Sequence, residues 1–123
     1  MNILAIDDSK AVHAFLKTIF RDTDHDLKEA MDGKQAMDMI QSGSVKPDVI
    51  LLDWEMPVMD GMETLAAIRD GKMEVPVIMV TSRNEVNQIV VALEKGANEY
   101  IMKPFTKDIL FEKLSMVMGT EIG

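Results

Sequence analysis

The sequence contains no cysteine among its 123 residues. Disulfide bridges, thiolate metal sites and cysteine nucleophiles are therefore excluded, so any metal site has to use oxygen ligands or the two histidines. The longest apolar runs have four to six residues, whereas a helix that spans a bilayer needs roughly 20. Asp7 and Asp8 also interrupt the region in which a signal peptide would be apolar. We therefore expect a cytosolic, cytoplasmic protein with no membrane association.

Basic residues are in the minority. The chain has 13 lysines and arginines against 21 aspartates and glutamates, which gives a formal net charge of −8 at pH 7. Proteins that bind nucleic acid neutralise its phosphates with a basic surface, so this composition disfavours DNA or RNA as a partner. Proline and glycine are few, and no linker or low-complexity stretch divides the chain. With 47% hydrophobic residues, the length predicts one domain over residues 1–123.

Five short apolar runs recur along the chain, at residues 3–6, 27–30, 49–52, 77–80 and 100–102. Runs this continuous are typical of strands that are buried on both faces, as in a parallel sheet. Each run is followed by a segment with helical spacing of apolar residues, within 12–20, 36–40, 62–68, 86–93 and 109–117. The alternation predicts an α/β fold of the (βα)5 type, with an open, doubly wound, five-stranded parallel sheet.

Polar side chains follow these runs at the points where the predicted strands end. Asp7 and Asp8 follow the first run, Asp53 the third, Thr81 the fourth and Lys103 the fifth. The carboxyl ends of parallel strands meet at one edge of the sheet, where ligands bind in open α/β folds, so these side chains should converge. Taken alone, an aspartate after a strand is usually a helix cap or a turn residue, and Asp8 could simply cap the first predicted helix. Coincidence is a poor explanation for the whole set, which we interpret as a site.

Three carboxylates at one edge repel one another and need a cation. Mg²⁺ prefers hard oxygen ligands and keeps positions open for phosphate oxygens, which suits a chain without cysteine. A carboxylate beside Mg²⁺ can attack a phosphoryl group and form an aspartyl phosphate. Asp53 is the expected nucleophile because it is alone on a central strand, whereas the adjacent Asp7 and Asp8 are suited to bind the metal. Lys103 and the Thr81 hydroxyl would contact the remaining phosphoryl oxygens.

Four segments together resemble the receiver domain of two-component response regulators, in particular its CheY-like members: IDDS (6–9), ILLDWEMPVMDGMETL (50–65), VIMVTS (77–82) and EYIMKPF (99–105). The resemblance covers essentially the whole chain. It implies a flavodoxin-like sheet with strand order 2-1-3-4-5 and a cis peptide bond between Lys103 and Pro104.

The resemblance also assigns roles to the polar residues. It implies that Asp7, Asp8 and Asp53 bind Mg²⁺ and that the Glu55 backbone carbonyl completes the metal shell. Asp53 is expected to accept a phosphoryl group from the phosphohistidine of a histidine kinase. Thr81 and Lys103, which the pattern of strand ends also singles out, would contact that group.

A switch is a further implication of the resemblance. Once a phosphoryl group is attached, the Thr81 side chain should move toward it, and the Tyr100 ring should turn into the vacated space. The surface altered in this way belongs to the fourth predicted helix, the fifth strand and the fifth helix. It carries Ile89, Tyr100, Met102 and Phe105 and would bind a downstream target protein, in chemotaxis or motility signalling. Core positions for Ile89 and Phe105 are the alternative, and phosphorylation-dependent dimerisation is left open.

Glu55 and Arg83 depart from a generic receiver. Their opposite charges predict a pair across the mouth of the site that obstructs the water needed for dephosphorylation, although a weak surface ion pair is an equally good explanation. Trp54, the only tryptophan, should report metal binding by fluorescence because it adjoins Asp53. His13 is one position away from the apolar stripe of the first predicted helix, so we expect it to be solvated.

Other interpretations remain open at this point. A small haloacid-dehalogenase-like phosphatase also uses an aspartate at a strand end, a threonine or serine, and a lysine, but it normally has a second aspartate where this chain has Glu55. The chain is also compatible with a receiver piece of a longer regulator that has a separate output domain, or with a relay that passes phosphoryl groups to a second histidine. We expect no enzyme activity beyond the chain's own phosphorylation and dephosphorylation.

Overall fold

The structure is a computed structural model that describes residues 1–122, and Gly123, the last residue of the predicted domain, lies outside the described residues. Strands and helices alternate along the whole of this range. Their bounds are β1 Asn2–Ile6, α1 Lys10–Phe20, β2 Asp26–Ala30, α2 Gly33–Ser42, β3 Val49–Leu52, α3 Gly61–Asp70, β4 Val77–Thr81, α4 Val86–Glu94, β5 Glu99–Met102 and α5 Lys107–Met118.

The five strands form one parallel sheet in the order β2-β1-β3-β4-β5. This order and the α/β fold class confirm the sequence prediction, and the observed strands differ from the predicted runs by at most one residue at an end. Strand β2 is the weakest apolar run because it lies at an edge of the sheet, where four of its five residues are exposed or only partly buried.

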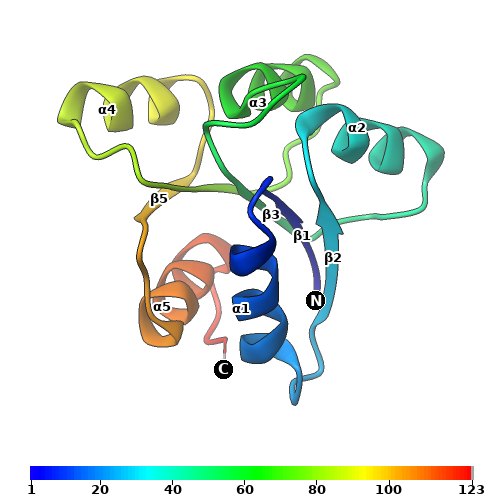
Figure 1. Cartoon of the computed structure of the whole chain (residues 1–123), viewed down its shortest axis with the longest axis vertical. Helices are drawn as coiled ribbons and strands as arrows, with labels where there is room; N and C mark the ends of the chain where they lie inside the picture. The colour runs from blue at the N-terminus through cyan, green and yellow to red at the C-terminus, as the bar shows by residue number, and fades with distance from the viewer. Residues whose placement is uncertain (123) are drawn as a thin grey trace.

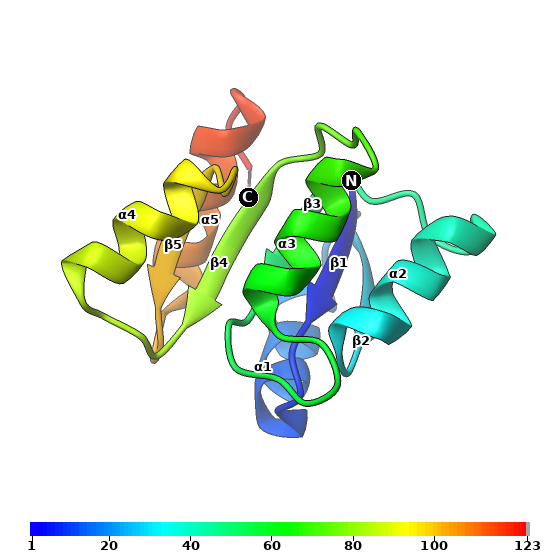
Figure 2. The same cartoon turned by 90° about the horizontal axis from the view of Figure 1, so that it is seen from above.

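Helices cover both faces of the sheet. Figure 1 shows α1 and α5 on one face and α2, α3 and α4 on the other, and Figure 2 looks onto the second layer from above. Alternate residues of a strand point to opposite faces, so each strand contributes to two cores. In β3, Ile50 and Leu52 pack with α2, α3 and α4, whereas Val49 and Leu51 pack with α1 and α5. Burial of strands on both sides explains why their apolar runs are continuous.

The register of the sheet aligns the ends of its central strands. Ile6, the last residue of β1, pairs with Leu52, the last residue of β3. The Asp53 backbone N–H continues this ladder by donating to the Ile6 carbonyl at 2.9 Å. Two helices that start beyond this edge are capped by side chains: Ser9 accepts from the Val12 N–H at the start of α1, and Asp60 forms a capping box with Glu63 in α3. Rigid elements therefore hold the polar residues at this edge.

The β3–α3 loop folds back tightly over the end of β3. The Gly61 N–H donates to the Trp54 carbonyl at 2.7 Å, and a Cβ at position 61 would overlap the Asp53 carbonyl. Only glycine permits this approach. Val58, at the tip of the loop, has a φ of +69°, an unusual value for a β-branched residue.

The helices are too short or too polar to cross a membrane. Within residues 1–122, no helix combines the length and the hydrophobicity that a membrane crossing needs.

Candidate functional site

Three carboxylates meet at the carboxyl edge of the sheet. One oxygen from each of Asp7, Asp8 and Asp53 lies within 4.8 Å of the others. Asp7 and Asp53 are buried, at 3% and 7% exposure, while Asp8 is exposed to solvent. The structure thus brings together the acidic residues that the sequence predicts as a site.

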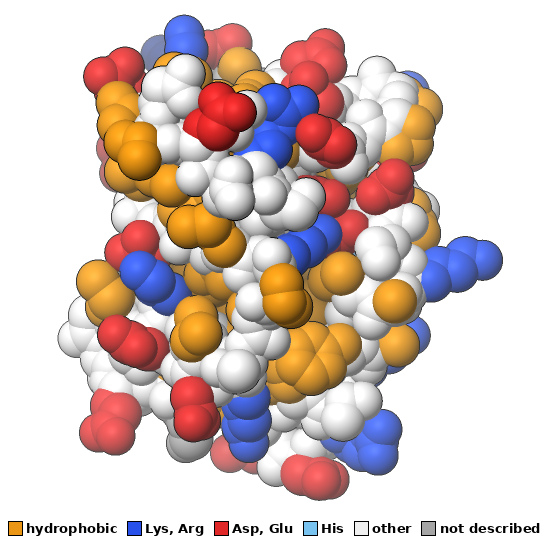
Figure 3. All heavy atoms as spheres, turned by 60° about the vertical axis from the view of Figure 1, so that its left-hand side comes forward, with side chains coloured by type: hydrophobic (Ala, Val, Ile, Leu, Met, Phe, Trp, Pro, Cys, Tyr) orange, Lys and Arg blue, Asp and Glu red, His pale blue; other side chains and the backbone are white. Residues whose placement is uncertain are grey.

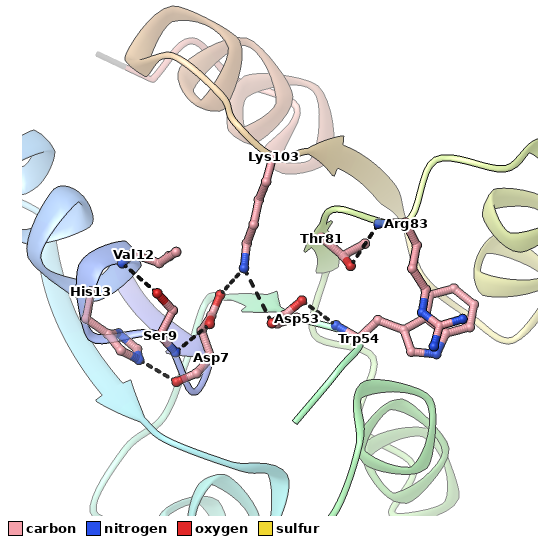
Figure 4. Close-up of polar contacts among 9 residues, drawn as sticks. All are labelled: Asp7, Ser9, Val12, His13, Asp53, Trp54, Thr81, Arg83 and Lys103. Atoms are coloured by element: carbon pink, nitrogen blue, oxygen red, sulfur yellow. Dashed lines mark hydrogen bonds and ion pairs between the residues drawn. The ribbon is translucent and has the colours of Figure 1, made fainter. Parts of the chain in front are cut away.

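Lys103 supplies a positive charge to this cluster. Its Nζ lies 2.7 Å from Asp7 Oδ2 and 3.4 Å from Asp53 Oδ2, so one ammonium bridges two carboxylates from β1 and β3 (Figure 4). The Lys103 backbone N–H donates to the Thr81 carbonyl at 3.0 Å, which ties the lysine to the end of β4. The peptide bond between Lys103 and Pro104 is cis, as predicted.

The environment of Asp53 disfavours its charged form. Burial, and then the neighbouring Asp7 carboxylate, raise the pKa of Asp53, while Lys103 and the Trp54 backbone N–H oppose the shift. The Trp54 N–H donates to Asp53 Oδ1 at 2.8 Å. With three carboxylates and one ammonium, the cluster has two uncompensated negative charges when every group is ionised. A divalent cation with hard oxygen ligands matches this excess, and the chain offers no thiolate that would select a softer metal.

Thr81 and Tyr100 are connected through the backbone of Arg83. The Arg83 N–H donates to the buried Thr81 hydroxyl at 3.3 Å, and the Tyr100 hydroxyl donates to the Arg83 carbonyl at 2.8 Å. The Tyr100 ring is 8% exposed, and burial raises the pKa of its hydroxyl. The structure therefore holds Tyr100 in an inward position.

The mouth of the site is an open cleft of about 600 Å³. The side chain of Arg83 lies across it, 3.0 Å from Glu55 Oε1 and 4.8 Å from the centre of the Trp54 ring. The predicted ion pair is thus present, and stacking on Trp54 holds the guanidinium in place. The side chain of Asp8 lines the same cleft.

The predicted partner surface is less exposed than expected. Phe105 is 9% exposed and belongs to the core, with its ring centre 5.5 Å from that of Phe15, and Ile89 packs against the opposite core. Met102, at the end of β5, is 48% exposed. Helix α4 exposes apolar side chains that its helical spacing suggests as core: Val86, Val90 and Leu93. Figure 3 shows such hydrophobic groups on this side of the molecule, interspersed with charged ones.

The expectation of a solvated His13 is wrong. His13 is 3% exposed and contacts the backbone of Asp7 directly behind the carboxylate cluster. Its place one position away from the apolar stripe of α1 did not reveal this contact, because the partners come from β1 and β2.

Comparison with known proteins now identifies the family. A family model of the response regulator receiver domain matches residues 3–115. The chain belongs to this family. The receiver domain is 38% identical to the chemotaxis protein CheY homolog of Campylobacter jejuni, an alignment that covers 100% of this chain and 96% of the relative. It is also 38% identical to the chemotaxis protein CheY of Pseudomonas aeruginosa, with 95% of each protein covered.

Solved structures agree with this assignment. The receiver domain of the Francisella response regulator 1452 superposes with a TM-score of 0.87 at 31% identity, covering 96% of each chain. The protein described here is therefore a response regulator of two-component signalling, and its receiver domain carries the carboxylate cluster at the edge where this fold binds ligands.

Proposed function

We propose that this receiver domain accepts a phosphoryl group on Asp53 from the phosphohistidine of a histidine kinase. The observation that carries the proposal is the cluster itself: three carboxylates with oxygens within 4.8 Å of one another, facing a single lysine. Asp53 is the preferred nucleophile because it alone of the three follows the central strand β3, and its Oδ2 lies 3.4 Å from Lys103 Nζ, whereas Asp7 Oδ2 is engaged by Lys103 at 2.7 Å. Asp53 lines the open cleft, where a phosphoryl group can reach it.

Mg²⁺ is the expected cofactor. The carboxylates of Asp7, Asp8 and Asp53, together with the Glu55 backbone carbonyl, would hold it, and their hard oxygens suit this ion. When bound, Mg²⁺ neutralises the excess negative charge and withdraws electron density from the phosphoryl oxygens. This charge neutralisation would relieve the repulsion that raises the pKa of Asp53 and would favour the ionised nucleophile.

The chemistry proposed for the side chains is a phosphoryl transfer. A carboxylate oxygen of Asp53 forms a bond to phosphorus as the bond between phosphorus and the histidine nitrogen breaks, and the imidazole leaves with the electron pair. Lys103 would move from bridging two carboxylates to contacting a phosphoryl oxygen. The Thr81 hydroxyl, which lies at the end of the adjacent strand β4, would donate to another.

The output would pass through Thr81 and Tyr100. Movement of the Thr81 hydroxyl toward the phosphoryl group breaks its hydrogen bond with the Arg83 N–H, and Arg83 in turn binds the Tyr100 hydroxyl. The partner face of α4, β5 and α5 would respond, with Met102 exposed, Ile89 partly buried, and Tyr100 and Phe105 buried. We propose a downstream target protein as the partner and chemotaxis as the pathway, because the relatives from Campylobacter jejuni and Pseudomonas aeruginosa are named as chemotaxis proteins.

Intact-protein mass spectrometry tests the phosphoacceptor. The full chain is incubated with Mg²⁺ and acetyl phosphate, beside Asp53→Ala, a sample with EDTA, and the matched surface control Asp38→Ala on α2. We expect one labile phosphoryl adduct on the wild type and on Asp38→Ala, and none in the other two samples. An adduct that persists in Asp53→Ala contradicts the assignment. Sustained turnover of a phosphate monoester would instead support a phosphatase.

A further inference from the structure

His13 is a buried polar residue that the phosphoryl-transfer chemistry does not use. Its side chain is 4% exposed and reaches back from the first turns of α1 toward the end of β1. Its Nε2 lies 2.7 Å from the backbone carbonyl oxygen of Asp7 (Figure 4). A carbonyl oxygen only accepts hydrogen bonds, so Nε2 carries a proton and donates it.

The other side of the ring faces a second pair of charges. Nδ1 of His13 lies 3.1 Å from Glu29 Oε2, and Glu29 Oε1 lies 3.0 Å from Nζ of Lys17. The contact at Nδ1 is close but is not a hydrogen bond. The ring is therefore held by its hydrogen bond from Nε2 to the Asp7 carbonyl and by its burial.

The Asp7 carbonyl is a critical place to anchor. It belongs to the peptide plane that joins Asp7 to Asp8, and this plane sets the directions in which both carboxylates leave the backbone. Only Asp7 to Ser9 separate β1 from α1, and the Asp7 N–H donates to the Ala30 carbonyl of β2 at 3.1 Å. Ser9 restrains it from the helix side, where its N–H donates to Asp7 Oδ1 at 2.9 Å. His13 restrains it from behind.

We propose that His13 is a positioning residue of the metal site, acting through the Asp7 carbonyl to aim Asp7 and Asp8 at the cation. His13 does not line the cleft and touches no reacting group, so its effect is on metal affinity rather than on the transfer step itself. Groups that orient metal-binding carboxylates typically change metal affinity by 10- to 100-fold when they are removed. The inference rests on the proposed function, since it requires the carboxylate cluster to bind Mg²⁺.

A titration with Mg²⁺ alone separates this role from a contribution to stability. Trp54 fluorescence follows binding to the full chain without any phosphodonor. We expect His13→Leu, which fills the site but cannot donate, to raise the Kd for Mg²⁺ by about 10-fold. His13→Gln keeps an N–H donor that can reach the carbonyl and should stay within about 3-fold of the wild type. Lys34→Ala, which breaks the surface ion pair with Asp38 on α2, is the control and should leave the Kd unchanged.

Two further measurements keep the result interpretable. Urea unfolding shows whether each variant is folded, and if His13→Leu is not, His13→Met, which likewise cannot donate a hydrogen bond, replaces it with the same expected weakening of about 10-fold. In the absence of metal, the backbone amide signals of Asp8 and Ser9 in NMR spectra should shift or broaden in His13→Leu and not in Lys34→Ala. A folded His13→Leu protein with wild-type affinity overturns the proposal, as does a His13→Gln protein that binds as weakly as His13→Leu. A wild type that binds no Mg²⁺ overturns the proposed metal site as well, so the two failures are distinguishable.

Discussion

The carboxyl ends and the amino ends of the parallel strands carry charged groups that are used in opposite ways. At the carboxyl edge, three carboxylates face one lysine and negative charge remains unmatched. At the amino edge, where the strands begin, Arg69 at the end of α3 donates five hydrogen bonds. Two go to the Gly96 carbonyl and one each to Met73 O, Val75 O and Asn98 Oδ1. A guanidinium has five N–H donors, so all of them are used. The hydrogen-bond donors of Arg69 are thus all used within the fold, whereas the carboxylate cluster keeps an excess of negative charge that the proposed function assigns to a cation.

The largest expected effect is on stability and concerns Arg69 at the amino edge. Arg69→Ala removes the donors that join the α3–β4 and α4–β5 loops and leaves their carbonyls unpaired, so the free energy of unfolding should fall by about 3 kcal/mol. Mg²⁺ affinity should not change, because Arg69 is at the opposite edge. Urea unfolding and the Trp54 titration measure the two quantities. Arg69→Lys, which retains the charge but lacks the planar fork, should recover only part of the stability.

The next prediction concerns the carboxylate cluster at the carboxyl edge. Because the folded state alone assembles the three carboxylates, Mg²⁺ at 100 times its Kd should stabilise the wild type by about 2.7 kcal/mol. Thermal or urea unfolding with and without the ion measures the gain. Asp8→Ala, which removes the exposed carboxylate of the cluster, should reduce this gain strongly. Equal gains in both proteins would mean that the cation binds elsewhere.

A smaller effect follows from the raised pKa of Asp53. The folded state holds this proton more tightly than the unfolded chain, so stability falls as the pH rises from the ordinary value of 3.8 through the raised pKa of the folded state. Asp53→Asn removes that loss, so without metal it should be more stable than the wild type at pH 7. Urea unfolding in EDTA between pH 4 and pH 7.5 measures the difference, which should shrink toward pH 4. A constant difference would contradict the electrostatic cause.

The smallest stability effect concerns the pair at the mouth of the cleft. Glu55 and Arg83 form a partly exposed ion pair, so Glu55→Ala and Arg83→Ala should each change stability by less than about 1 kcal/mol. Dephosphorylation should nevertheless become about 3-fold faster. This rate change corresponds to a lowering of the activation free energy by less than about 1 kcal/mol. Decay of the phosphorylated protein after removal of the phosphodonor gives the rate. Unchanged decay rates in both variants would mean that the ion pair does not obstruct the attacking water.

The sequence predicts the residues at the carboxyl edge better than those at the amino edge. Asp7, Asp53 and Thr81 can be placed because parallel strands bring their carboxyl ends together, and apolar runs reveal where those strands end. Arg69 gives no such signal, since most of its partners are backbone carbonyls that every residue possesses. The prediction for His13 fails for a related reason. Its burial depends on contacts with other segments of the chain and not on the apolar stripe of its own helix.

The exposed residues of α4 illustrate the same limit. Helical spacing identifies an apolar stripe but does not specify whether the fold covers all of it. In α4 only Ala92 is fully buried, and Val86 remains 76% exposed. Phe105 is the reverse case, because the neighbouring Phe15 covers a side chain that the sequence assigned to the surface.

The inward position of Tyr100 has a consequence for signal quality. Its hydroxyl donates to the Arg83 carbonyl at 2.8 Å, and under the proposed function phosphorylation of Asp53 would shift the populations of the ring positions. A gap of about 1.4 kcal/mol between two positions leaves roughly one molecule in ten in the minor one. The unstimulated protein would then produce a constant background of output. Its sensitivity would depend on how far the phosphoryl group raises the active fraction above that background.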